Sequence, residues 1–209
     1  MGVRRLTRAG LVAAAAVALG ALPASAQSFT FSTSGAFSGG SGGTVCVAAN
    51  CTAGGFTLSF INAPSAGYIA PTLVDLGQFN LLAVEPTQPL TAFTGAVFTL
   101  TINQTLPSVG SGVFSGSVSG SVAYNNSTSS LVWNPTSSLL TIGTVRYTLV
   151  VDNSGNINIQ APTLGGNPNV TSVKANVSLT PEPATALLLA PGLAGMGLAA
   201  RFRRRRSAK

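Results

Sequence analysis

The chain has 209 residues and a formal net charge of +7, yet only 7% of its residues are charged and it contains no histidine. All of its 11 basic residues except Arg146 and Lys174 lie near the two ends. The stretch from Gln27 to Thr180 therefore has a formal charge of −1, which argues against nucleic acid as a partner. The absence of histidine removes the usual general base and the usual activator of a nucleophile.

The first 26 residues have the pattern of a cleaved secretory signal peptide. A basic start is followed by an apolar run over 11–22 and by the small residues of an Ala-x-Ala box at 24–26. We therefore expect export by the general secretion machinery and cleavage between Ala26 and Gln27. The arginines of the basic start are Arg4, Arg5 and Arg8.

The segment 27–180 predicts a single extracytoplasmic all-β domain, because a chain of this length forms one core. Apolar and polar residues alternate along it, which places the apolar side chains on one face of each strand. We expect about nine or ten short strands in an antiparallel β-sandwich of jelly-roll or immunoglobulin-like topology. A one-sheet solenoid is less favoured because no repeat period is visible. The alternating patterns lie at 29–31, 56–60, 98–102, 114–124, 145–151, 157–159 and 173–179, with a short apolar run at 131–133.

Two further segments of this domain carry structural predictions. The run Asp152-Asn153-Ser154-Gly155-Asn156 predicts a hairpin loop between two strands. The glycine-rich stretch from 110 to 123 has two interpretations. It is either a flat ligand platform with an approachable backbone, or a strand packed closely under a neighbouring aromatic side chain. The second interpretation is favoured.

The only cysteines, Cys46 and Cys51, lie close together in a Gly/Ala-rich segment. In an oxidising compartment this spacing predicts a disulfide that closes a small loop. Two thiols without a histidine form an incomplete ligand set, so no metal site is expected.

The domain offers little chemistry beyond three carboxylates, Asp75, Glu85 and Asp152. A glycosidase would need two of them facing one another across a sugar, and nothing in their spacing brings two together. The loop after Asp152 is faintly similar to a calcium loop, but it supplies one carboxylate where an EF-hand loop supplies several. We therefore expect no catalytic residue, no cofactor and no metal, and predict that the protein is not an enzyme.

Three aromatic residues, Tyr124, Trp133 and Tyr147, could stack on sugar rings and so form a glycan-binding module. However, both tyrosines lie on the apolar faces of their predicted strands, and Trp133 ends a short apolar run. Packing in the core or at its rim is the better interpretation for each residue.

The segment 181–209 carries the clearest motif of the chain. The triplet Pro181-Glu182-Pro183 precedes an uncharged apolar run over 184–200, which is near the lower limit of about 17–25 residues for a transmembrane helix. The basic tail behind that run would stay cytoplasmic and place everything before Pro181 outside. This tail contains Arg201, Arg203, Arg204, Arg205 and Arg206.

The order of triplet, apolar span and arginine cluster resembles the PEP-CTERM sorting signal of Gram-negative bacteria. The resemblance implies recognition of Pro181, Glu182 and Pro183 by exosortase, a membrane-embedded cysteine transpeptidase, with cleavage near that motif. The alternative is a plain C-terminal membrane anchor in which the triplet is only a linker.

The expected function is therefore a structural or interaction protein of the cell surface or extracellular matrix. Its expected partners are the secretion machinery, the inner membrane as an intermediate, exosortase and exopolysaccharide. The resemblance adds the association with exopolysaccharide and biofilm. A glycan-binding module and an enzyme remain alternatives from other classes.

Overall fold

The computed structural model describes residues 26–124, 126–127, 130–133, 138–161 and 170–180. Within these ranges every regular element is a β-strand, and every strand pair is antiparallel. The predicted all-β class is confirmed. The same ranges contain no helix long and apolar enough to cross a membrane. The predicted span over 184–200 lies outside them, as does the predicted signal peptide up to residue 25.

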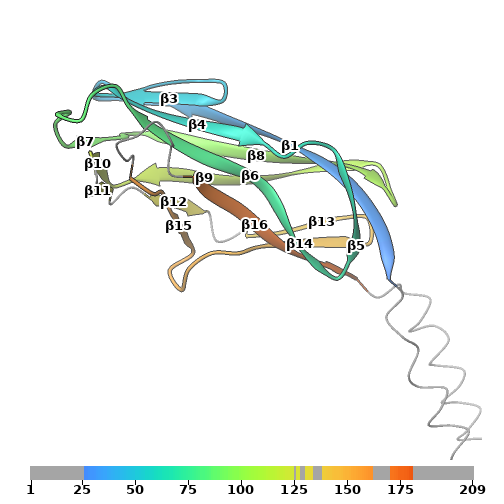
Figure 1. Cartoon of the computed structure of the whole chain (residues 1–209). Helices are drawn as coiled ribbons and strands as arrows, with labels where there is room; N and C mark the ends of the chain where they lie inside the picture. Colours follow the sequence, from blue (N-terminus) through green and yellow to red (C-terminus); the bar gives the residue numbers. More distant parts are fainter. Residues whose placement is uncertain (1–25, 125, 128–129, 134–137, 162–169, 181–209) are drawn as a thin grey trace, which may run out of the picture.

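The first sheet, sheet A, has six strands in the order β15-β12-β9-β8-β1-β5. Three of its strands are long and neighbour one another (Figure 1). The bounds are β1 Gln27–Gly39, β5 Ala66–Ala70, β8 Ala96–Leu106, β9 Gly110–Ser119, β12 Ser130–Trp133 and β15 Asn156–Asn158.

The second sheet, sheet B, has seven strands in the order β13-β14-β16-β6-β4-β3-β2, and a small third sheet has the order β11-β10-β7. The bounds in sheet B are β2 Val45–Val47, β3 Asn50–Ala53, β4 Phe56–Asn62, β6 Thr72–Ala83, β13 Leu139–Ile142, β14 Val145–Leu149 and β16 Val170–Leu179. The bounds in the small sheet are β7 Thr91–Ala92, β10 Ser121–Ala123 and β11 Asn126–Ser127.

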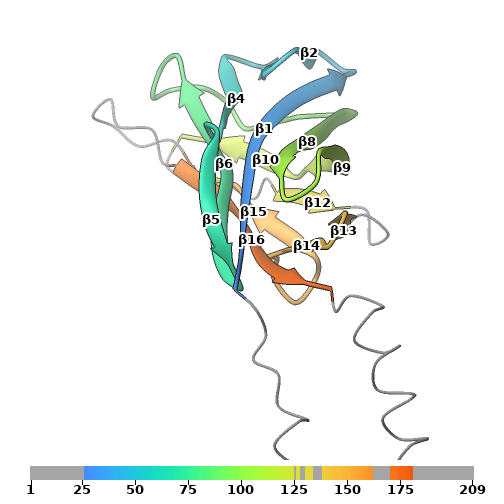
Figure 2. The same ribbon diagram turned by 90° about the vertical axis from the view of Figure 1, so that its right-hand side faces the viewer.

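Sheets A and B face one another and curl into a half-barrel, with β1 at the corner where the layers meet (Figures 1 and 2). Beyond its pairing with β5, the outer edge of β1 bonds to the end of β4 and to the turn between β2 and β3. Gly35 N–H donates to Asn62 Oδ1 at 2.8 Å, and Phe37 N–H donates to the Ala48 carbonyl at 2.6 Å. These bonds satisfy backbone groups that would otherwise form an open sheet edge.

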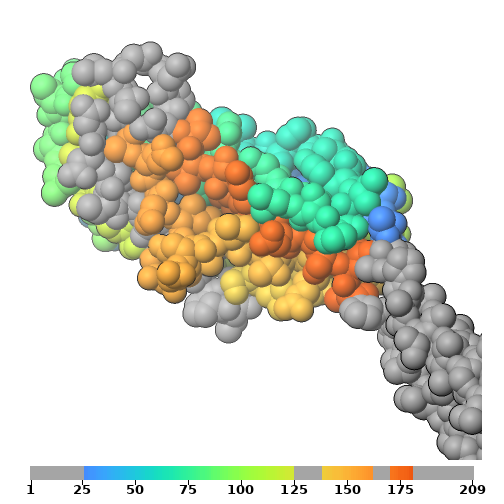
Figure 3. All heavy atoms as spheres, turned by 60° about the horizontal axis from the view of Figure 1, so that its bottom comes forward, coloured from blue at the N-terminus to red at the C-terminus, as the bar shows by residue number. Residues whose placement is uncertain are grey.

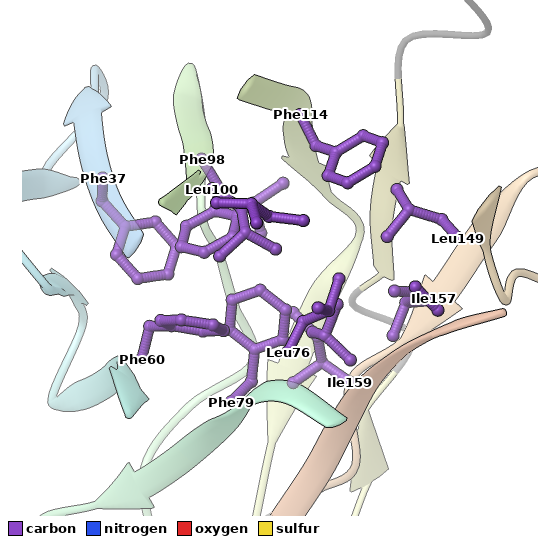
Figure 4. Packing of buried hydrophobic residues seen from close by; sticks show 14 of the residues in the cluster. Phe37, Phe60, Leu76, Phe79, Phe98, Leu100, Phe114, Leu149, Ile157 and Ile159 are labelled. Atoms are coloured by element: carbon purple, nitrogen blue, oxygen red, sulfur yellow. The ribbon is translucent and has the colours of Figure 1, made fainter. Parts of the chain in front are cut away.

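The core between the sheets is built on phenylalanine. Phe37 and Phe98 of sheet A meet Phe60 and Phe79 of sheet B, and Phe98 lies 4.8 Å, centroid to centroid, from each of the other three rings (Figure 4). Every phenylalanine in the described ranges is buried. Each such ring contributes about 1.5–3 kcal/mol relative to an exposed ring, so this layer stabilises the contact between the two sheets. The alternating faces predicted from the sequence are confirmed at these positions.

The longest of the strands that the sequence patterns missed is β6, which lies at the centre of sheet B. In the first half of β6 the even-numbered residues Val74 and Leu76 are buried, whereas in the second half the odd-numbered residues Phe79 and Leu81 are buried. The phase changes at Gly77, where φ is +123° and the pairing with β16 shifts register. A β-bulge of this kind inserts one residue and hides the strand from a period-two search.

The prediction of a hairpin at 152–156 is wrong, because the strands on either side of this turn do not pair with one another. The backbone does turn tightly there, since Asp152 N–H donates to the Asn156 carbonyl at 2.9 Å. However, β14 before the turn belongs to sheet B, whereas β15 after it belongs to sheet A. The segment crosses between the layers because Tyr147 and Leu149 pack from sheet B and Ile157 packs from sheet A.

The glycine-rich segment divides into β9 and β10 at Gly120, where φ is +87°. A side chain at Gly112 would overlap Leu140 of β13, and a Cβ at Gly110 would lie 2.7 Å from Ile142 Cγ2. The interpretation as a closely packed strand is therefore correct at these two glycines, although the neighbours are aliphatic and not aromatic. Their absent side chains let β13 of sheet B approach β9 of sheet A.

Candidate processing site and interaction surfaces

Cys46 and Cys51 form the predicted disulfide and face one another across the β2–β3 pair. Cys51 is buried and belongs to the core cluster, and Cys46 is partly buried against it. The bond therefore fastens the short edge hairpin of sheet B to the core. It is a structural staple on a loop, as expected.

The three carboxylates lie in separate parts of the domain. Asp75 lies on the exposed face of β6, and its Oδ1 accepts a hydrogen bond from Gly77 N–H at 2.8 Å, which stabilises the bulge. Glu85 is exposed in the loop after β6. Asp152 Oδ1 accepts from the N–H groups of Ser154 and Asn156 at 2.9 and 2.8 Å.

Asp152 thus caps its own turn, which is the ordinary role of an aspartate followed by Asn, Ser and Gly. No group of three or more His, Cys, Asp or Glu side chains that could hold a metal ion occurs in the described ranges.

The aromatic residues considered for sugar stacking are placed differently by the fold. Tyr147 is fully buried, and its ring packs edge-on against Phe29 and Phe31 at 6.1 and 5.9 Å. Tyr124 is half-buried. Trp133 is the last residue of β12, opposite Gly116 in register, and its side chain lies outside the description. For Tyr147 the core interpretation is correct.

The hydroxyl of Tyr147 belongs to a buried polar network that the sequence did not suggest. It donates to Gln104 Oε1 at 2.8 Å, while Gln104 Nε2 donates to the carbonyls of Ser108 and Ile142 at 3.0 and 3.3 Å. Gln104 is only 1% exposed, and burial raises the pKa of Tyr147. Because Gln104 belongs to sheet A and Tyr147 to sheet B, this network ties the two layers together.

The two ends of the described domain meet at one residue, Thr144. Its Oγ1 donates to Gln27 Oε1 at 3.2 Å, and its carbonyl accepts from the N–H of Thr180 at 2.8 Å and from the Thr180 hydroxyl at 3.2 Å. Gln27 is the first residue of β1, and Thr180 directly follows β16. Figure 2 shows both strand ends at the same pole of the domain.

This pole is where the two predicted processing sites join the domain. The predicted cleavage between Ala26 and Gln27 falls at the first residue of β1, and Ala26 itself is exposed. The motif Pro181, Glu182 and Pro183 begins one residue after the Thr144 contact. The motif, the apolar run 184–200 and the tail with Arg201, Arg203, Arg204, Arg205 and Arg206 lie outside the described residues.

The outer faces of the two large sheets differ in chemistry. Sheet B exposes Asp75, Arg146 and Lys174 together with large apolar residues such as Ile61 and Leu82. Figure 3 shows β6 and β16 side by side on this surface, in green and orange. Sheet A exposes no charged residue along β1, β8 and β9, where serine and threonine dominate.

No protein-family model, curated protein or solved structure matches this chain.

Proposed function

We propose that this chain is an exported structural or interaction protein of the cell surface or extracellular matrix, processed at both ends. The general secretion machinery exports it, signal peptidase cleaves it before Gln27, and exosortase cleaves it near Pro181-Glu182-Pro183. It passes through the inner membrane as an intermediate and associates afterwards with exopolysaccharide. We class its two layers as a β-sandwich of jelly-roll or immunoglobulin-like type, and we propose no catalytic role.

The observation that carries this proposal is the meeting of Gln27 and Thr180 at Thr144. A domain whose ends leave from one pole can fold while both flanking segments are still held in the same bilayer. The rest of its surface then faces away from the membrane and is free for partners. The disulfide between Cys46 and Cys51 adds support, because such bonds persist mainly in oxidising compartments.

The test is the intact mass of the protein from its native host, measured after fractionation of cells and medium. We expect a mass that begins at Gln27 and ends near Pro181, in the surface or medium fraction. Any excess would identify a group attached at the cleaved end. A mass that runs to Lys209 in the membrane fraction would reduce the tail to a plain anchor.

Glu182→Ala tests the motif itself, with Glu85→Ala as a matched control. Glu85 is an exposed loop acid outside the motif, so its loss removes the same charge. We expect the Glu182 variant to accumulate unprocessed in the inner membrane and the Glu85 variant to be processed normally. Equal processing of both variants would show that the motif assignment is wrong.

A further inference from the structure

The outer side of sheet A carries a continuous surface of small hydroxyl side chains, here called the hydroxyl face. It comprises the even-numbered positions 28–38 of β1, the odd-numbered positions 97–105 of β8 and the odd-numbered positions 111–119 of β9. Serine or threonine fills these positions except at Ala36, Val97, Asn103 and Val113. All of them are exposed or half-buried, whereas the intervening positions of β1 and β8 are mostly buried core.

The strand registers arrange these side chains in rows. Ser34 of β1 lies opposite Thr101 of β8, which lies opposite Val113 of β9. The next row runs from Ser32 through Asn103 to Ser111. Neighbouring strands are about 4.8 Å apart and alternate residues along a strand about 6.7 Å apart, so the hydroxyls form a regular grid.

The hydroxyl face is also neutral. The five charged residues of the 27–180 segment all lie elsewhere. Asp75, Arg146 and Lys174 project from sheet B. Glu85 and Asp152 lie in loops. With no cation on this face, there is nothing to attract phosphate, uronate or anionic lipid.

The side chains on this face also limit which neutral partner fits it. The anchors of protein interfaces are large aromatic, Met and Arg side chains, and the face carries none. A hydroxyl group has one donor and two acceptors, as a sugar hydroxyl has, and on this face Thr105 Oγ1 already donates to the Thr30 carbonyl at 3.4 Å. A single hydrogen bond contributes only about 0.5–1.5 kcal/mol net to binding. Measurable affinity therefore requires one extended molecule that forms hydrogen bonds with many rows of the hydroxyl face.

We infer that the hydroxyl face binds a neutral polysaccharide chain lying across β1, β8 and β9. The inference deepens the proposed association with exopolysaccharide and rests on it for the setting. It does not depend on exosortase processing. Without an aromatic platform each sugar is held weakly, so long or insoluble polymers bind and short oligosaccharides do not.

The test is co-sedimentation of the purified full-length protein, in detergent, with cellulose, curdlan and starch granules as neutral probes. Soluble alginate, measured by affinity electrophoresis, is the anionic comparison. Thr101→Arg places a long charged side chain at the centre of the face. Thr148→Arg is the matched control, because Thr148 is exposed on the outer side of β14 in sheet B.

We expect binding to at least one neutral polymer that is unchanged by added salt. Thr101→Arg should weaken it at least about tenfold, a loss of two or three such hydrogen bonds, while Thr148→Arg binds like the wild type. If Thr101→Arg does not fold, the near-isosteric Thr101→Val removes the same hydroxyl and should still weaken binding.

Several outcomes would overturn the inference. They are no binding to any of the three neutral polymers, equal binding by both arginine variants, or binding that salt abolishes. A dimer that Thr101→Arg converts to a monomer, with no polymer bound, would assign the face to a second copy of the chain. A negative binding result would not contradict the proposed processing at the Glu182 motif, because the intact mass tests that step separately.

Discussion

Replacing Tyr147 with Phe tests whether the buried network holds the two sheets together. The change keeps the ring that packs against Phe29 and Phe31 and removes only the hydroxyl that donates to Gln104 Oε1 at 2.8 Å. Gln104 is 1% exposed, so water cannot replace the lost donor at its oxygen. An unsatisfied buried carbonyl costs about 1–3 kcal/mol, and we expect the free energy of unfolding to fall by about 2 kcal/mol.

The assay is equilibrium unfolding of the processed protein in urea, followed by circular dichroism. With a slope of about 1–3 kcal/mol per molar urea, the midpoint should fall by roughly 1 M. Tyr68→Phe is the control, because the Tyr68 ring stacks on Phe29 and Phe31 and its hydroxyl makes no hydrogen bond with the described residues. A loss for Tyr147→Phe no larger than that for Tyr68→Phe would refute the reasoning.

The same residue predicts a pH dependence. Burial raises the pKa of Tyr147 above the ordinary tyrosine value of about 10. Its contribution to stability is therefore fully present below pH 10. It is lost as the pH rises further, because the unfolded chain then releases a proton that the folded protein retains. We expect wild-type stability to fall more steeply above pH 10 than that of Tyr147→Phe. Identical slopes would contradict the assignment.

Three other variants, one of them a double mutant, test local features of the fold. Gly77→Ala should lower the free energy of unfolding by about 2 kcal/mol or more, because φ is +123° and the new Cβ would lie 2.5 Å from Cζ of Phe60. Gly67→Ala is the control, because a Cβ at Gly67 would meet only an ordinary contact. Replacing both Cys46 and Cys51 by Ser should lower the free energy of unfolding by about 2 kcal/mol, because the disulfide closes a short loop, and should leave the fold intact. An unfolded double mutant would show that the domain cannot fold without this disulfide. Asp152→Ala should cost about 1 kcal/mol through the lost turn bonds, and calcium should not stabilise the wild type if Asp152 only caps a turn.

Much of the fold follows from local patterns that the sequence carries openly. Alternation at 56–60 and 98–102 assigns Phe60 and Phe98 to the core, because side chains on a strand point to opposite faces in turn. The spacing of Cys46 and Cys51 likewise predicts their disulfide, since only a small loop separates them. The predicted processing signals also depend on contiguous segments, so the sequence alone suffices to propose them.

Only the tertiary structure decides features that depend on distant partners. Gly77 reverses the phase of β6, and nothing near it in sequence shows that β16 accepts the bulge. The turn at 152–156 has hairpin chemistry, yet the strands on either side join different sheets because strand pairing is non-local. Gln104 meets Tyr147, and Gln27 and Thr180 meet Thr144, across large separations in sequence. Such contacts depend on how the layers stack, which no local period encodes.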